Sequence, residues 1–111
     1  MRVSLLLFPV LLAAACASPP DPNATLDPQA AEGRYLVKIH CADCHAIDRH
    51  DGSKHPEAPP FRELSKRYPV DSLAESLAEG IVVGHPDMPE FRFRPEDVSA
   101  IISWLEAIQD R

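Results

Sequence analysis

The sequence predicts an all-α domain of about four helices joined by long loops. Two segments, 28–41 and 95–108, carry apolar residues at spacings of three and four, the period of a helix with one buried face. No stretch of useful length alternates apolar with polar residues, so no β-strand is expected. The chain also holds 12 prolines among its 111 residues, which favours irregular connections between the helices.

The N-terminal residues, 1–17, have the pattern of an export signal. A positive charge at Arg2 precedes a mostly apolar run over residues 3–15, and small residues follow. In a helix that run would cover only about 20 Å of the roughly 30 Å hydrocarbon core that a membrane span must cross. Residues 18–27 then form a proline-rich tether, and the folded domain is expected over residues 28–111.

Two cleavage sites compete at the end of this signal. Three alanines before Cys16 resemble a bacterial lipobox, although the leucine usually found three residues before the cysteine stands one place earlier, at Leu12. Cleavage there would make Cys16 a lipidated N-terminus, whereas cleavage after Ala17 would release a soluble chain beginning at Ser18. The scarcity of cysteine and its position favour lipidation. Both routes export the domain to the periplasm, and the first anchors it to a membrane as a lipoprotein.

The first helix is expected to begin at Asp27-Pro28, because aspartate favours the N-cap and proline the first helical position. Gly33 inside this helix costs about 1 kcal/mol relative to alanine, so it marks a close approach by another element. The residues that share the apolar face are Ala30, Gly33, Leu36, Val37 and His40 or Cys41. Residues 46–60 are polar and proline-bearing, which predicts a loop.

Two shorter helices are expected next. Residues 60–68 can form one of them, with Phe61, Leu64 and Tyr68 facing inward. Asp71 is expected to cap the other, which ends at Gly80.

The last helix is expected to follow a loop over residues 81–94. Pro95 suits its first position, and Glu96 and Asp97 complement the helix dipole in its first turn. The residues that form its buried face are Val98, Ile101, Ile102, Leu105 and Ile108.

Size and charge narrow the classes of cofactor and partner. Without the signal, about 95 residues remain, which is few for a self-sufficient hydrophobic core, so a covalent staple or a large apolar cofactor would complete it. The formal net charge is −6. An acidic domain of this kind is not expected to bind nucleic acid.

The sequence Cys41-Ala42-Asp43-Cys44-His45 is the C-x-x-C-H pattern of covalent haem attachment. Two cysteines three residues apart lie on one side of a helical turn, so their sulfurs can form thioethers with two vinyl groups of one porphyrin. His45 follows directly and is placed to bind the iron as the proximal ligand. The pattern predicts one haem c per chain, held by Cys41 and Cys44.

Three other kinds of site use such a cysteine pair, and the sequence supports each of them less. A structural zinc site needs two more ligands at finger spacing, and the remaining histidines, His40, His50, His55 and His85, are not paired in that way. A thioredoxin-like dithiol follows a strand in a βαβ pattern that is absent here. A disulfide between Cys41 and Cys44 would close a very small loop.

The second iron ligand is expected from the loop over residues 84–91. Met88 is the only methionine that remains after signal removal, and Pro86 and Pro89 stiffen its loop. A thioether suits low-spin haem iron and raises its reduction potential. His85 is the alternative ligand. The other histidines are expected in solvated loops, with His40 at a helix end.

The order of these motifs over residues 28–110 resembles class I c-type cytochromes, the bacterial monohaem cytochrome c family. In that family a helix with a glycine leads into C-x-x-C-H, as Gly33 does eight residues before Cys41. The resemblance implies a cytochrome c fold wrapped around one haem, with Trp104 of the last helix packed on Gly33. It also implies that the backbone carbonyl of Pro59 supports His45, with Pro60 as the alternative, and that Met88 is the axial ligand.

The resemblance implies an electron carrier rather than an enzyme. Its partners would be redox proteins, such as a dehydrogenase, a cytochrome complex or a terminal oxidase, and the chain is expected to act as a monomer. The alternative is a haem enzyme or sensor, peroxidase-like, in which Met88 dissociates and His85 is the distal acid–base group.

Charge is uneven along the chain. Residues 48–67 hold five Lys/Arg against four Asp/Glu, and residues 71–110 hold two against nine. This asymmetry would orient an encounter complex or simply belong to solvated faces.

Overall fold

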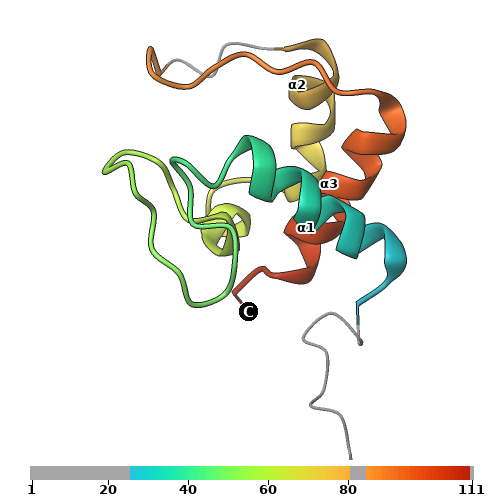
Figure 1. The fold of residues 1–111 in the computed structure, drawn as a ribbon, viewed down its shortest axis with the longest axis horizontal. Coiled ribbons are helices and arrows are strands. Elements are labelled where there is room, and N and C mark those ends of the chain that lie inside the picture. Colours follow the sequence, from blue (N-terminus) through green and yellow to red (C-terminus); the bar gives the residue numbers. More distant parts are fainter. Residues whose placement is uncertain (1–25, 81–84, 111) are drawn as a thin grey trace, which may run out of the picture.

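The structure, a computed structural model, describes residues 26–80 and 85–110 (Figure 1). Over these ranges the chain forms the α-helices α1 (Pro28–His40), α2 (Leu73–Glu79) and α3 (Pro95–Ala107), and the 3-10 helices η1 (Phe61–Lys66) and η2 (Val70–Ser72). No strand occurs in them, which confirms the all-α class. In the same ranges, no helix is both long and apolar enough to cross a bilayer. The export signal with Cys16, and the tether up to residue 25, lie outside the described residues.

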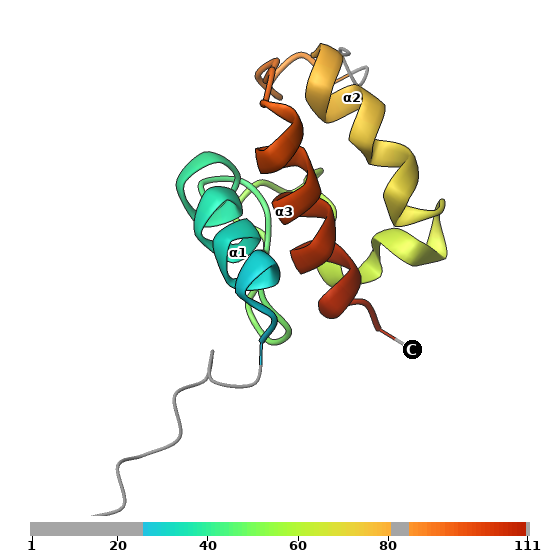
Figure 2. The same cartoon turned by 90° about the vertical axis from the view of Figure 1, so that its right-hand side faces the viewer.

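The two long helices, α1 and α3, cross in direct contact (Figure 2). Gly33 explains how closely they approach. A Cβ atom at this position would lie 1.8 Å from the backbone oxygen of Ala100 and 3.0 Å from the Cβ of Trp104. Only a residue without a side chain permits this crossing, so the helix-propensity cost of Gly33 is offset by packing against α3.

The ends of the helices follow the proline and glycine positions of the sequence. Proline is the first residue of both α1 and α3, and α2 ends at Gly80, which adopts a left-handed conformation with φ of 76°. Asp27 occupies the N-cap position of α1 but makes no side-chain cap; its carboxylate instead accepts a hydrogen bond of 3.4 Å from the Ser103 hydroxyl.

Two expectations for the middle of the chain are wrong. The helix expected over residues 60–68 is the shorter η1, which ends at Lys66, because Pro69 disfavours a helical backbone at Tyr68. Asp71 does not cap α2, because it lies inside η2, a 3-10 turn that precedes the helix. The N-cap residue of α2 is Ser72, whose hydroxyl donates back to the Pro69 carbonyl.

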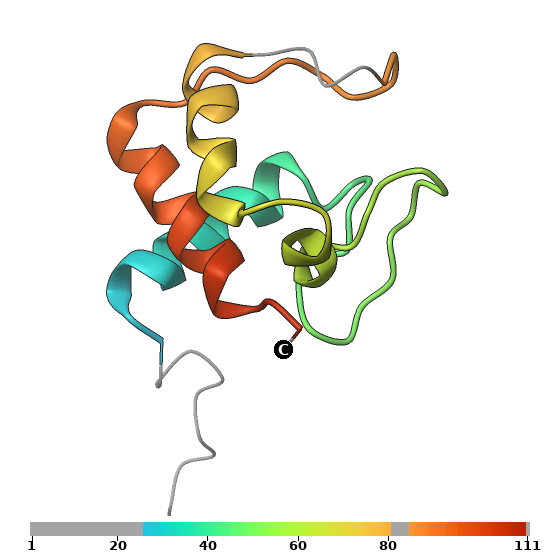
Figure 3. The ribbon, with the colours of Figure 1, turned by 180° about the vertical axis from the view of Figure 1, so that it is seen from behind.

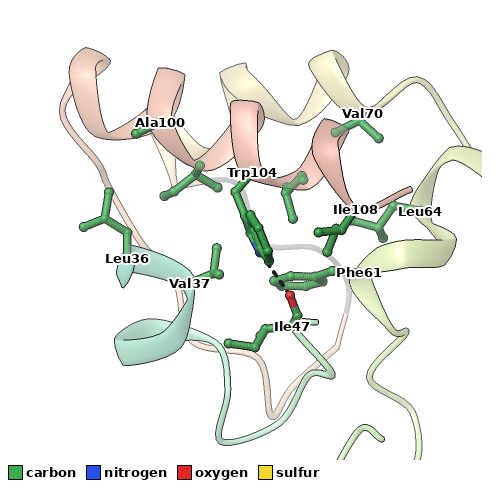
Figure 4. Close-up of a cluster of buried hydrophobic side chains, with 11 residues drawn as sticks. Leu36, Val37, Ile47, Phe61, Leu64, Val70, Ala100, Trp104 and Ile108 are labelled. Carbon is green, nitrogen blue, oxygen red and sulfur yellow. Dashed lines mark hydrogen bonds between the residues drawn. The ribbon is translucent and has the colours of Figure 1, made fainter. Parts of the chain in front are cut away.

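The hydrophobic core lies where α1, α3 and η1 meet (Figure 4). Val37 and Ile108 are its most completely buried large side chains. Trp104 crosses the core and its indole Nε1–H donates to the Ile47 carbonyl at 3.0 Å, which ties α3 to the loop after α1. Of the residues predicted to form the buried face of α3, only Ile102 is partly rather than fully buried.

Two irregular segments extend from the same side of this helical core (Figure 3). One is the loop over residues 41–60, and the other is the segment 85–94. Together with the helices they enclose the cavity described next.

Candidate functional site

A single cavity of about 450 Å³ collects the chemistry-bearing residues of the C-x-x-C-H motif and of the Met88 segment. Its floor is apolar and includes Val37 of α1, Leu64 of η1, and Ile101 and Leu105 of α3. Cavities of this size and character hold cofactors and other small molecules.

The C-x-x-C-H motif forms the turn that follows α1. The Cys41 N–H donates to the Val37 carbonyl at 2.8 Å, and the Cys41 carbonyl accepts from the N–H groups of Cys44 and His45 at 3.1 and 2.9 Å. The chain therefore keeps a helix-like turn across the motif, and all three side chains line the cavity.

Both cysteines are free thiols rather than a disulfide. Burial, with a smaller contribution from neighbouring Cys44, raises the pKa of Cys41 to about 12, so it is protonated at neutral pH. Zinc binding needs thiolates and further ligands. In the described parts of the chain, the one group of three or more candidate metal ligands includes neither cysteine.

The His45 ring is held by the backbone carbonyl of Pro59, at the far end of the loop. Its Nδ1–H donates to the Pro59 carbonyl at 2.8 Å, and its ring packs on Phe61 with centroids 4.6 Å apart. Burial lowers the pKa of His45 and outweighs the opposing effect of the Pro59 hydrogen bond, so the neutral ring is favoured. Because a carbonyl can only accept, the proton is on Nδ1 and Nε2 keeps a free lone pair for a metal.

The loop that carries Pro59 is braced from within. The Asp51 carboxylate accepts the N–H groups of Ile47 and Asp48 at 2.8 and 3.0 Å, and the Phe61 N–H donates to the Ala46 carbonyl at 2.9 Å. These bonds fix the start and end of the loop.

The two prolines suggested for His45 have different partners. Pro59 accepts from His45, whereas the carbonyl of Pro60 accepts from the Glu63 N–H at 3.1 Å.

Met88 reaches the cavity from the segment 85–94. Its N–H donates to the His85 carbonyl at 3.2 Å, which closes a turn, and its side chain lines the cavity while remaining 39% exposed. His85 lines the same cavity, but its Nε2 contacts the Glu57 carboxylate. The cavity thus brings together Cys41, Cys44, His45, Pro59 and Met88. The other predicted site residue, Cys16, lies outside the described residues.

These residues fit a haem. Two adjacent thiols, a neutral imidazole with a free Nε2 and a thioether are the donor set of a covalently attached haem with histidine and methionine ligands. The rest of the wall is mostly apolar, and no buried side-chain nitrogen or oxygen of the described residues lacks a hydrogen-bond partner.

Sequence reasoning missed several side chains of the wall. Tyr68 was expected to face inward, and it lines the cavity, where burial raises the pKa of its phenol. His55 was expected in solvent, but it lines the cavity and pairs with Asp87 at 3.3 Å. His40 does end α1 as expected, and its ring contacts those of Phe91 and Phe93.

Comparison with known proteins agrees with the donor set of the cavity. No curated protein gives a significant match to the chain. Residues 28–105, most of the chain, match the family described as "Cytochrome C oxidase, cbb3-type, subunit III". The match runs from the first residue of α1 to Leu105 of α3 and spans every residue that lines the cavity. The chain therefore belongs to this family and contains a c-type cytochrome domain, which indicates haem binding and electron transfer.

Proposed function

We propose that this chain is an electron carrier that holds one haem, attached through Cys41 and Cys44, and exchanges single electrons with redox proteins outside the cytoplasm. The observation that carries the proposal is the convergence of both thiols, the oriented imidazole of His45 and the thioether of Met88 on one cavity. When bound, haem supplies an iron that alternates between Fe(II) and Fe(III).

The protein's own residues fix the cofactor and keep water away. Cys41 and Cys44 would each supply a sulfur for a thioether bond, and their position on one turn sets the spacing. His45 would bind through Nε2, while its hydrogen bond to Pro59 fixes the ring orientation and raises the basicity of the ligand. Met88 would complete the ligand set, and the apolar floor would exclude solvent.

The family match supports a terminal oxidase as one partner. Its description names a subunit of a cbb3-type oxidase, so we place the electron acceptor or donor of this chain in such an assembly. A dehydrogenase or another cytochrome complex would supply the other partner. The chain itself would act as a monomer.

We also propose that the chain is exported to the periplasm, and that lipidation of Cys16 anchors it to a membrane. The proline-rich tether would then hold the cytochrome domain away from the membrane surface.

The three cysteines allow a matched test of attachment. Protein isolated from an exporting cell should gain the mass of one haem and keep its colour through acid–acetone extraction. Cys41→Ser with Cys44→Ser should lose all of the extraction-resistant haem, whereas Cys16→Ser should keep it and lose only acylation and partition into detergent. Wild-type protein that releases its haem on extraction would contradict covalent attachment.

A haem enzyme or sensor is the second candidate, and the exposed position of the turn that carries Met88, with Pro86 and Glu90 at the surface, favours it. An iron ligand on an exposed turn can dissociate and open a position for peroxide or a gas. Fast binding of azide or peroxide to the wild-type protein would support this candidate over the carrier.

A further inference from the structure

A three-residue motif, histidine-proline-acid, occurs twice in the chain. His55-Pro56-Glu57 lies in the loop after α1, and His85-Pro86-Asp87 lies in the segment that carries Met88. The structure brings the two copies into contact. The centroids of the two histidine rings are 5.2 Å apart, and the rings are nearly perpendicular, at 83°. Neither copy has a part in the proposed haem ligation.

The two motifs contact each other crosswise. The Nε2 of His55 lies 3.3 Å from a carboxylate oxygen of Asp87, and the Nε2 of His85 contacts the carboxylate of Glu57. Candidate ligand atoms of His55, His85 and Asp87 all lie within 4.8 Å of one another. The ligand atoms of His55, His85 and Asp87 therefore converge from two loops, and Glu57 joins them through its contact with His85.

We propose that these four residues, His55, Glu57, His85 and Asp87, form a binding site for a divalent zinc ion at the rim of the cavity. Two imidazoles and two carboxylates are ligands that zinc accepts in four-coordinate sites. In a tetrahedral site with bonds of about 2.0–2.1 Å, neighbouring ligand atoms are about 3.3 Å apart. The separation of His55 and Asp87 already has that value.

The site is open to an ion from solvent. The side chains of His55 and His85 are 26% and 33% exposed, and those of Glu57 and Asp87 are 66% and 68% exposed. Two carboxylates would balance the charge of a divalent cation, so the occupied site carries no net charge. A bound ion would replace the crosswise hydrogen bonds by four metal–ligand bonds.

Zinc binding requires each of the two imidazole rings to change its tautomer. The Nδ1 atoms now accept the N–H groups of Glu57 and Asp87 at 3.2 and 3.3 Å. An imidazole bound through Nε2 releases its Nε2 proton and must then carry a proton on Nδ1. These two long hydrogen bonds are therefore lost when the ion binds.

An occupied site would have two structural consequences. It would cross-link the loop 41–60 to the Met88 segment, and it would engage His85 so that this histidine is not an iron ligand. All four ligands belong to the rim of the cavity, so zinc binding does not require a particular group inside it.

Zinc titration of the chelator-treated holoprotein, without an affinity tag, tests the site. Calorimetry should show one zinc bound per chain, and millimolar Mg²⁺ should not compete, because a hard cation disfavours imidazole ligands. His55→Ala and His85→Ala should each weaken binding at least about tenfold, since each removes one of four ligands. His50→Ala is the matched control: it removes an exposed histidine of the same loop outside the cluster and should leave the affinity unchanged.

Near-isosteric variants separate the loss of a zinc ligand from the loss of the fold. Glu57→Gln and Asp87→Asn keep side-chain shape, and each should weaken zinc binding while the visible haem spectrum stays that of the wild type. Hydrogen exchange of the backbone around Met88 should slow when zinc is added to the wild type and not when it is added to His55→Ala. Absence of one-to-one binding, or wild-type affinity in His55→Ala and Asp87→Asn, would overturn the proposal.

Discussion

At His45, one hydrogen bond determines which ring nitrogen is available to a metal. The Pro59 carbonyl holds the proton on Nδ1, and burial keeps the second proton off Nε2. The result is a neutral ligand of fixed orientation, which is the form that haem iron requires.

Met88→Ala tests the second axial ligand. Loss of the thioether should lower the reduction potential by on the order of 0.1 V, a fraction of the roughly 0.8 V that axial ligands can span. It should also open the iron to azide. Spectroelectrochemistry measures both effects.

Because His85 lies three residues away and could substitute for the lost ligand, the matched control is Met88→Ala combined with His85→Ala. His85→Ala alone should leave the potential close to that of the wild type. A wild-type spectrum that Met88→Ala does not alter would contradict the assignment.

Cys41 should be a slow nucleophile in a haem-free chain that keeps this fold. Burial raises its pKa to about 12, against about 8.5 for an unfolded cysteine, so less of it is thiolate at any pH below 12. In a chain whose other cysteines are replaced by serine, iodoacetamide at pH 8.5 should react on the order of a thousandfold faster in urea than in buffer. The rate in buffer should rise tenfold per pH unit up to about 12. Equal rates in buffer and urea would show that the thiol is not buried.

The local part of the site could be predicted from the sequence, and its non-local part could not. Cys41, Cys44 and His45 are neighbours in the chain, so their spacing alone indicates how they act together. The pairing of His55 with Asp87 depends on how two loops meet across the cavity, and no periodicity encodes that. The repeated histidine-proline-acid motif was the only sequence feature that could have suggested it.

Among the elements, the crossing of α1 and α3 places the strictest demand on sequence. The crossing leaves no room for a side chain at residue 33, and Trp104 packs beside it. This contact sets the position of the turn after α1, and hence of the motif that the turn carries.

Gly33→Ala should destabilise the protein despite the better helix propensity of alanine. The gain of about 1 kcal/mol from propensity is outweighed by a methyl group that would meet the Ala100 backbone, since overpacking costs about 1–3 kcal/mol or more. We expect a net loss of about 2 kcal/mol in the free energy of unfolding, measured by denaturant titration.

Gly52→Ala is the matched control, because a Cβ at residue 52 has no atom within 4 Å. It should change the free energy of unfolding by less than about 0.5 kcal/mol. A Gly33→Ala protein as stable as the wild type would show that the helices can separate without cost.

The starts of the two long helices and the end of α2 could be predicted because they are encoded locally. Pro28, Pro95 and Gly80 each stand at the boundary that their backbone preferences favour. The 3-10 turns could not be predicted, because Phe61 and Leu64 fit a period of three as well as one of 3.6. Pro69 was the available indication that Tyr68 would leave the helix.

On the surface of the molecule, acidic side chains occur together on η2 and α2, and α2 borders the cavity. Asp71, Glu75 and Glu79 are exposed on η2 and α2, whose residues Leu73 and Leu77 line the cavity wall. Negative charge next to the proposed electron-transfer site favours a partner with a basic surface.

Neutralising this acidic surface should slow association with a basic redox partner. Glu75→Gln with Glu79→Gln should lower the second-order rate of electron transfer at low salt by about threefold to tenfold, with little difference from the wild type at high salt. Stopped-flow kinetics over a range of ionic strength measures the effect. Glu32→Gln with Glu63→Gln removes the same charge from exposed or half-exposed sites that do not line the cavity, and should change the rate less. Equal slowing by both pairs would mean that net charge alone matters.

Trp104, the only tryptophan of the chain, is an intrinsic fluorescent probe. Trp104 is 5% exposed, its Cβ lies next to Gly33, and its indole donates a hydrogen bond to Ile47, two residues after His45. A porphyrin in the cavity would lie close enough to quench the Trp104 fluorescence by energy transfer. The folded holoprotein should therefore show very weak tryptophan emission. Emission should brighten in step with separation of α1 from α3. Fluorescence lifetimes would therefore follow the assembly of helices and cofactor in one measurement, without any added dye.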